Sequence, residues 1–227
     1  MRRLLALLVI AMIAGCSGGI IRPTIEDGIR DALPDYIGPA KDYNVHCEGD
    51  STAMLGGVIR RLHIEGKDVQ VDPNLLLSRL IVDMDRVHFN PTNHKMKSVE
   101  DTSFEAVVTE KAVNHYIEQT RDSESQLGVG LEPGKVLVTF VPSIGGLDIL
   151  ISVAGTLSVV EGDKVNFEAD KAAVAHLPIP ALVANKVLDR VNPVLDMSEM
   201  KFPVTLSSIT INKGTVSIKG SAKFGDD

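Results

Sequence analysis

The fold is decided by a stretch that opens with Lys135-Val-Leu-Val-Thr-Phe-Val141 and ends at His176. Two further runs of the same kind follow the first, at Leu147–Val160 and at Lys164–Ala169. Glycine-containing turns precede each run, and β-branched side chains are enriched within them, which is typical of strands joined by short turns. The stretch therefore predicts the consecutive strands of a central sheet.

Neither face of the first two runs is charged. Along Val136–Val141 the side chains on both faces are apolar or carry a hydroxyl, and the alternation along Ile149–Ala154 has the same character. An antiparallel sheet with one solvated face would show a polar residue at every second position. We therefore expect this sheet to be covered on both faces, by helices on one and by an apolar partner on the other.

The composition is that of a globular domain with an aliphatic core. The chain has 227 residues, of which 44% are hydrophobic but only 4% aromatic, and a chain of this length fits a single domain. The net charge is −7 and no polybasic run is present. A nucleic-acid partner, which needs a clustered basic footprint, is therefore not expected, and neither is simple electrostatic adsorption to anionic lipid.

The N-terminus has the form of an export signal. Arg2 and Arg3 precede an apolar run, Leu4–Ala14, that is too short to span a bilayer core of about 30 Å. The sequence Ile13-Ala-Gly-Cys16 looks like a bacterial lipobox, in which the cysteine is lipidated and becomes the mature N-terminus. The alternative is an ordinary cleaved signal followed by a chance cysteine. Stable anchoring in a membrane requires more than one lipid chain on this cysteine.

The lipobox resemblance divides the chain into a signal peptide at residues 1–15, the lipidated Cys16 with a short linker at residues 16–23, and a single domain at residues 24–227. The protein is then expected in the bacterial cell envelope, lipid-anchored and facing the periplasm or the cell exterior. With Cys16 modified, Cys47 has no disulfide partner, and its alternation with Tyr43 and Val45 favours a buried thiol on a strand.

Other elements flank the central strands. One helix is expected to begin with Thr24 as its N-cap and to bury a stripe that ends at Tyr36. A second is expected from a Thr109 cap to about Arg121, with Asn114 on its solvent side. Leu75–Phe89 mixes the signals of a helical turn and a strand. The remaining expected elements are strands at residues 42–48, 58–66, 68–71 and 104–108, a third helix from residue 180, and a closing hairpin at residues 202–212 and 215–224.

Several segments, taken in order, resemble the LmeA-like phospholipid-binding family of bacterial envelopes. They are Thr109-Glu-Lys-Ala-Val-Asn-His-Tyr-Ile117, the glycine-turned hairpins, Val191-Asn-Pro-Val-Leu-Asp-Met197, and a terminal hairpin that ends in Val216-Ser-Ile-Lys-Gly220. The resemblance covers about residues 24–224. It implies an α+β fold in which a long curved antiparallel sheet wraps around a few amphipathic helices, similar to tubular lipid-binding proteins, with an apolar channel for acyl chains. It identifies no head-group contact.

Motifs for covalent chemistry are weak. Gly49-Asp50-Ser51 resembles the nucleophile block of the Gly-Asp-Ser hydrolases, but the Gly-x-Asn-Asp block is missing and His176 lacks the Asp-x-x-His spacing. A turn built from these residues is the simpler interpretation. The six histidines are scattered without metal-ligand spacing. The sequence therefore predicts a protein that is not an enzyme and that needs no metal or cofactor.

The apolar side chains of the central strands are the candidate lipid-binding residues. An acyl chain offers no hydrogen bonds, so a tunnel that holds it needs walls with few polar atoms. The same side chains could equally pack on one another in a closed core, and the helix near residues 183–191 could serve as a lid. The candidates are Val138, Phe140, Ile149, Ile151, Val153, Leu157, Val159 and Phe167, with Val183, Val187 and Leu188 on the lid.

We therefore expect a membrane-anchored envelope lipoprotein that binds a phospholipid or glycolipid in an apolar groove and could transfer it, without covalent catalysis. The alternative is a structural or assembly lipoprotein that meets another, unidentified envelope protein through an apolar surface. A lipid hydrolase is a third and weaker hypothesis.

Overall fold

The computed structural model describes residues 21–90, 96–120, 126–141, 143–144, 147–148, 150–174, 177–178, 192–198 and 203–223. Most of these residues lie in antiparallel strands, so the described fold is mainly β, with helices as covers, rather than a balanced α+β architecture. The helices are α1 (Ile21–Tyr36), α2 (Ser51–Leu55) and α3 (Glu110–Thr120). The strands are β1 (Ala40–Glu48), β2 (Val58–Asp72), β3 (Leu75–Phe89), β4 (Met96–Ser98), β5 (Asp101–Thr109), β6 (Gln126–Glu132), β7 (Lys135–Val141), β8 (Ser143–Ile144), β9 (Leu147–Asp148), β10 (Ile151–Val160), β11 (Lys164–Val174), β12 (Leu177–Pro178), β13 (Leu195–Asp196), β14 (Val204–Asn212) and β15 (Thr215–Ala222).

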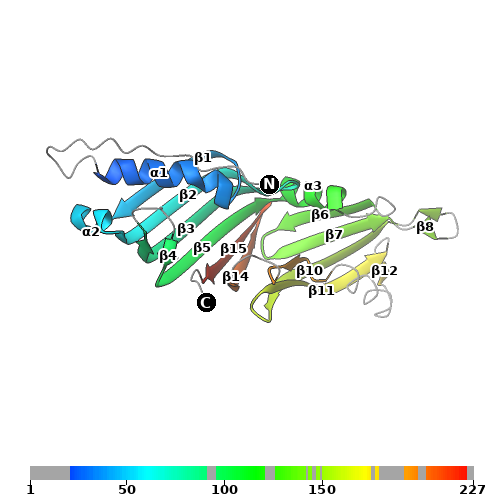
Figure 1. Ribbon diagram of the computed structural model, residues 1–227. Coiled ribbons are helices and arrows are strands. Elements are labelled where there is room, and N and C mark those ends of the chain that lie inside the picture. Colours follow the sequence, from blue (N-terminus) through cyan, green and yellow to red (C-terminus); the bar gives the residue numbers. More distant parts are fainter. Residues whose placement is uncertain are drawn as a thin grey trace, which may run out of the picture.

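The larger of the two main sheets, sheet A, combines the N-terminal strands with the C-terminal hairpin. Its strands lie in the order β1-β2-β3-β5-β15-β14, and β4 pairs with the end of β3 (Figure 1). The two strands expected at residues 58–66 and 68–71 are one continuous strand, β2, because Asp68 takes a positive φ of 50° while the pairing with β3 continues. The segment at Leu75–Phe89 is a strand from its first residue, without a helical turn.

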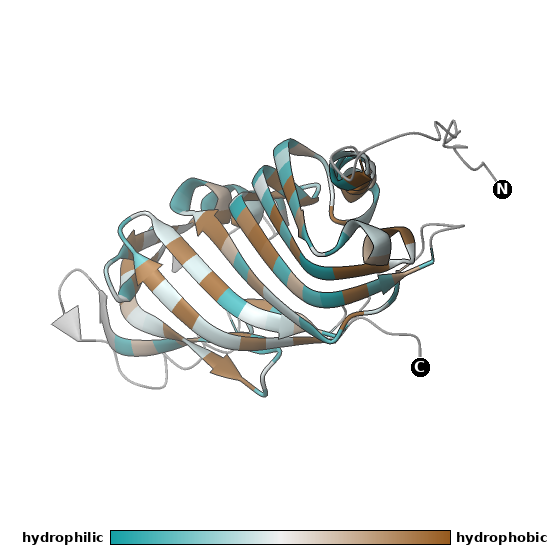
Figure 2. Ribbon diagram, turned by 90° about the vertical axis from the view of Figure 1, so that its left-hand side faces the viewer, coloured by the Kyte–Doolittle hydropathy of each residue, from teal (hydrophilic) through white to brown (hydrophobic). Residues whose placement is uncertain are grey.

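Sheet A curls strongly (Figure 2), and burial alternates along its strands so that apolar residues lie on the inner face and charged residues on the outer face. Val45, Ile64 and Val82 lie side by side on the inner face and are 2–8% exposed. A glycine on this face lets the ring of its cross-strand neighbour lie against the backbone. A Cβ added to Gly220 would lie 2.7 Å from the ring of its partner Phe104, so this close packing requires glycine.

The smaller sheet, sheet B, contains the central strands that the sequence predicts. Its order is β12-β11-β10-β7-β6, with β13 paired to β11, and β11 extends to Val174, beyond its expected end. Main-chain hydrogen bonds join the two sheets at β14 and at the turn that follows it. The Gly134 N–H donates to the Ile211 carbonyl at 2.9 Å, and the Leu206 N–H donates to the Gly162 carbonyl at 2.6 Å. The hairpin turns of sheet B therefore hold its inner face against the edge of sheet A.

Helices α1 and α2 cover the inner face of sheet A near β1 and β2. Leu33 of α1 and Met54 of α2 are 6% and 1% exposed and belong to one buried cluster with the strand residues. Helix α1 begins at Ile21, so Thr24 lies inside it and is not its cap. The buried stripe stops at Leu33, since Tyr36, at the end of the helix, is 80% exposed. No helix in the described ranges is long and apolar enough to cross a membrane.

Helix α3 ties the two sheets together. Thr109 caps it as predicted, since its Oγ1 accepts a hydrogen bond from the Ala112 N–H at 3.2 Å. The prediction that Asn114 faces solvent is wrong, because its side-chain amide bonds both the N–H and the carbonyl of Val129, each at 2.7 Å. Strand β6 is an edge of sheet B, and Asn114 satisfies main-chain groups that an edge strand would leave open.

Candidate functional site

Seven of the candidate lipid-binding residues are described, and they share the inner face of sheet B. In the register of β7, β10 and β11, each of the seven lies directly opposite an apolar side chain of the neighbouring strand. The pairs are Ile151 with Phe140, Val153 with Val138, Leu157 with Phe167, and Val159 with Val165. Ile149, Val183, Val187 and Leu188 lie outside the described residues, as does the third expected helix.

Four of the seven side chains form a closed core. Val138, Ile151, Val153 and Phe167 are 2–4% exposed. They pack in one cluster with Ile211 of β14 and Val216 of β15. In this arrangement other protein atoms cover these four side chains, so they support the inner face of sheet B and offer no free surface to a ligand.

The other three, Phe140, Leu157 and Val159, are only half-buried, and they adjoin further half-buried apolar residues of sheet A. In sheet A the exposure rises along one row of cross-strand neighbours. Leu80 is 8% exposed, whereas its neighbours on β5, β15 and β14 are half-buried. We call the half-buried set that runs across the meeting point of the sheets the junction stripe; its members are Phe104, Ala106, Ile209, Ile218, Leu157 and Val159.

Sequence reasoning missed the four members of the junction stripe in sheet A. Their segments were correctly predicted as strands, but alternation alone does not distinguish a half-buried inner position from a buried one. Phe104 is informative because it packs against two buried clusters, one within sheet A and one that joins Val165 of sheet B to β14 and β15. The only available signal was the pairing of an aromatic ring with Gly220, and that pairing depends on a register between strands 116 positions apart in the chain.

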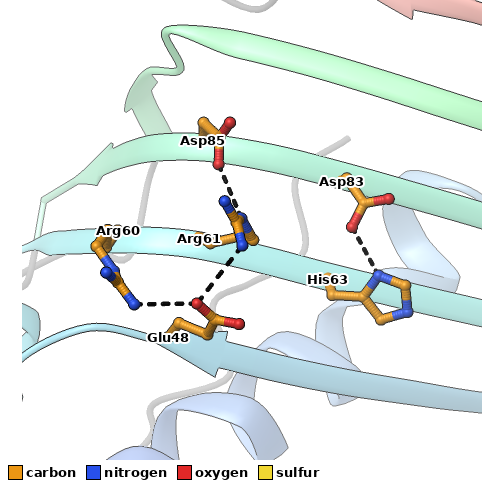
Figure 3. Close-up of polar contacts among 6 residues, drawn as sticks. All are labelled: Glu48, Arg60, Arg61, His63, Asp83 and Asp85. Carbon is orange, nitrogen blue, oxygen red and sulfur yellow. Dashed lines mark hydrogen bonds and ion pairs between the residues drawn. The ribbon is translucent and has the colours of Figure 1, made fainter.

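The outer face of sheet A is charged and internally paired. Glu48 accepts from Arg60 at 3.1 Å and lies 3.7 Å from Arg61, which also bonds Asp85 at 3.2 Å (Figure 3). His63 Nδ1 lies 2.7 Å from the Asp83 carboxylate on the adjacent strand (Figure 3). Asp83 and Asp85 alternate with buried side chains of β3 and so lie on its solvated face. These exposed pairs satisfy one another and contribute little to stability.

The outer face of sheet B departs from the expectation of an apolar cover. Leu137 on this face is 39% exposed, and Leu150, just before β10, is 58% exposed. The positions between are small or hydroxyl-bearing, as in Thr139 and Ala154, and are half-buried. Neutral side chains of this kind tolerate contact with water, so the absence of charge did not by itself require a second cover.

A polar hollow lies at the β1 edge of sheet A. Its volume is about 320 Å³, and most of its lining is charged or carries a hydrogen-bonding group. Such a lining would leave polar groups unpaired against an acyl chain, so this hollow is unsuited to the apolar part of a lipid. Its lining residues are Arg30, Asp42, Tyr43, Asn44, Glu65 and Lys67.

The Gly49-Asp50-Ser51 segment starts a helix. The Asp50 carboxylate accepts hydrogen bonds from the N–H groups of Thr52 and Ala53 at 2.9 and 3.2 Å, as the N-cap of α2. These bonds hold the pKa of Asp50 below its ordinary value. The segment therefore has a local structural role that needs no hydrolase chemistry. In the described ranges, no three side chains of the metal-ligating types gather at one point.

Cys47 is buried, as the alternation of β1 predicts. Its side chain is 0% exposed, and burial, with a further contribution from the Glu26 carboxylate, raises the pKa of the thiol to about 12. A thiol with such a pKa stays protonated and unreactive at neutral pH. Cys47 is therefore part of the core.

Comparison with known proteins agrees with the resemblance seen in the sequence. The model of the family described as LmeA-like phospholipid-binding matches residues 18–221, which is nearly the whole chain. No curated protein and no solved structure matches the chain at a significant level. On the extent of the family match, the chain belongs to the LmeA-like phospholipid-binding family.

Proposed function

We propose that this protein is a membrane-anchored envelope lipoprotein that binds a phospholipid or glycolipid by its acyl chains and transfers it without covalent chemistry. Membership of a phospholipid-binding family supports the lipid ligand. The single observation that carries the proposal is the junction stripe, a run of half-buried apolar side chains on the inner faces of two sheets. The lipobox-like Cys16 supports the anchor.

The chemistry of the stripe suits a hydrocarbon chain. Its side chains carry no polar atom, so an acyl chain laid along them leaves no hydrogen-bonding group unpaired. Each methylene that leaves water contributes about 0.8 kcal/mol, so a few methylenes already supply useful affinity. Of the residues proposed from the sequence, Leu157, Val159 and Phe140 would contact the lipid, while Val138, Ile151, Val153 and Phe167 would shape the floor beneath it.

Mass spectrometry of bound lipid tests the proposal directly. The domain beginning at Ser17 is expressed in the export compartment of a bacterium, purified without detergent and extracted with organic solvent. We expect about one phospholipid or glycolipid per protein and a release of that lipid to acceptor vesicles. A folded, detergent-free domain that contains no lipid and takes none up from vesicles would contradict the proposal.

The anchor is tested separately by metabolic labelling with a palmitate analogue. The label should appear on the full chain and be lost in Cys16→Ala, because the lipobox cysteine is the expected attachment point. Equal labelling of both proteins would show that the acyl group is elsewhere and would remove the lipoprotein part of the proposal.

A second candidate function is the binding of another envelope protein. The part of the outer face of sheet B where β7 pairs with β10 favours it, because the side chains there are neutral and Leu137 and Leu150 remain exposed. Exposed leucines among neutral side chains are more typical of an interface than of a solvated sheet face. If cells with Leu137→Lys behave as though the protein were inactive while the purified variant still carries lipid, the binding of another envelope protein is supported.

A further inference from the structure

We propose that one end of the molecule, which carries α2 and β4, rests on the membrane, so that sheet B points away from the bilayer. The α2 end is defined by Leu55, Gly57, Phe89 and Met96. Figure 1 shows α2 and β4 at one end and sheet B at the other. The inference rests on the proposed lipidation of Cys16 and adds to it an orientation and a docking surface.

The chain enters the described part of the molecule next to the start of α2. Helix α1 begins at Ile21, and Arg22 in its first turn points its guanidinium at the Gly49 carbonyl, 3.4 Å away, directly before the start of α2. Five peptide units separate Cys16 from Ile21, and they span at most about 18 Å when fully extended. A lipid chain on Cys16 would therefore hold the first residue of α1 within about 18 Å of the bilayer surface, and the α2 end lies beside that first turn.

Exposed apolar side chains carry the second step. Leu55 at the end of α2 is 60% exposed, and Met96 on β4 is 42% exposed. Their backbone segments are neighbours, because the Phe89 N–H donates to the Gly57 carbonyl at 2.8 Å and Phe89 also pairs with Met96. Large apolar side chains that enter the interfacial region of a bilayer strengthen binding in proportion to the area that they bury.

The charges at this end carry the third step. Arg60 and Arg86 are 74% and 65% exposed, and their partners Glu48 and Glu100 are less exposed, at 36% and 55%. Acidic side chains lie at this end as well, since Asp50 before α2 is exposed and Asp85 is 53% exposed beside Arg61, so the charges here are mixed and largely paired. A surface of mixed, paired charges suits a bilayer of zwitterionic head groups, where apolar contact and not charge attraction would hold this end.

Depth-dependent fluorescence quenching tests the orientation. Leu55→Cys and, as a matched control, Leu150→Cys are made in the full, lipidated chain. The two leucines are 60% and 58% exposed; Leu55 ends α2, whereas Leu150 directly precedes β10 of sheet B, at the other end of the molecule (Figure 1). Each variant is labelled with an environment-sensitive dye and reconstituted into phosphatidylcholine vesicles that contain spin-labelled lipid. Cys47 is buried and does not take up the dye in the folded protein.

We expect quenching at position 55 to exceed that at position 150 by at least threefold. Equal quenching at both positions, or stronger quenching at position 150, would overturn the inference. Palmitate labelling and lipid content are measured on the same preparations. An acylated, lipid-carrying protein without quenching at position 55 would refute the orientation alone. A protein without label or without lipid would refute the proposed anchor or the proposed ligand, respectively.

Discussion

Replacing Ala106 with aspartate tests whether the junction stripe holds lipid. Ala106 is half-buried on the inner face of β5, between Leu80 and Ile218 in register. A carboxylate at a half-buried position keeps some contact with water, so we expect the free energy of unfolding to fall by about 1–3 kcal/mol. A domain with about 5–15 kcal/mol of stability would remain folded.

The effect on lipid should be larger than the effect on folding. An acyl chain packed against the new carboxylate would cost at least about 2 kcal/mol of binding free energy, which is about a 30-fold loss of affinity. The matched control is Val107→Asp, one residue along the same strand but on the outer face, where the cross-strand neighbour is Arg79. Val107→Asp should keep its lipid.

Lipid content is measured by mass spectrometry and stability by urea denaturation on the same samples. A folded Ala106→Asp protein that carries as much lipid as the parent would show that the lipid lies elsewhere. Loss of lipid in both variants would show that the effect is not specific to the inner face. As a reference for a closed core, Ile151→Asp should unfold, because Ile151 is 4% exposed and a charge there has no access to water.

Three further predictions concern stability and reactivity. Gly220→Ala should lower the free energy of unfolding, measured by urea denaturation, by about 1–3 kcal/mol, because the added Cβ would lie 2.5 Å from a main-chain oxygen. Gly28→Ala should raise the same free energy by about 0.5–1 kcal/mol, because Gly28 is an exposed helix position with no atom near the added Cβ. The Cys47 thiol should react with a thiol reagent far more slowly in the folded protein than in denaturant, and similar rates would show that it is accessible. The hydrogen bond from Arg79 lowers the pKa of Glu65. The stability that this bond contributes should therefore be complete above the ordinary pKa near 4.5 and be lost as the pH falls below it. Glu65→Gln should weaken this pH dependence in urea titrations between about pH 3 and pH 7.

The local patterns of the sequence were sufficient for most of the strands. Alternation placed Tyr43, Val45 and Cys47 on one buried face, and the turn residues at Glu161–Asp163 and Lys213-Gly214 marked hairpins that form as predicted. These features depend on neighbours within a few residues, so periodicity and turn chemistry determine them. The cap at Thr109 was predictable for the same reason.

Only the tertiary structure decided how the strands are divided and what each face meets. The C-terminal hairpin completes sheet A beside β5, more than 100 residues earlier in the chain, and its register brings Gly220 under the ring of Phe104. Asn114 looked like a solvent-facing helix residue until β6 was placed beside it. The junction stripe exists because two sheets meet there, and pairing over such distances leaves no periodic signal in the sequence, since it depends on the packing free energy of the whole chain.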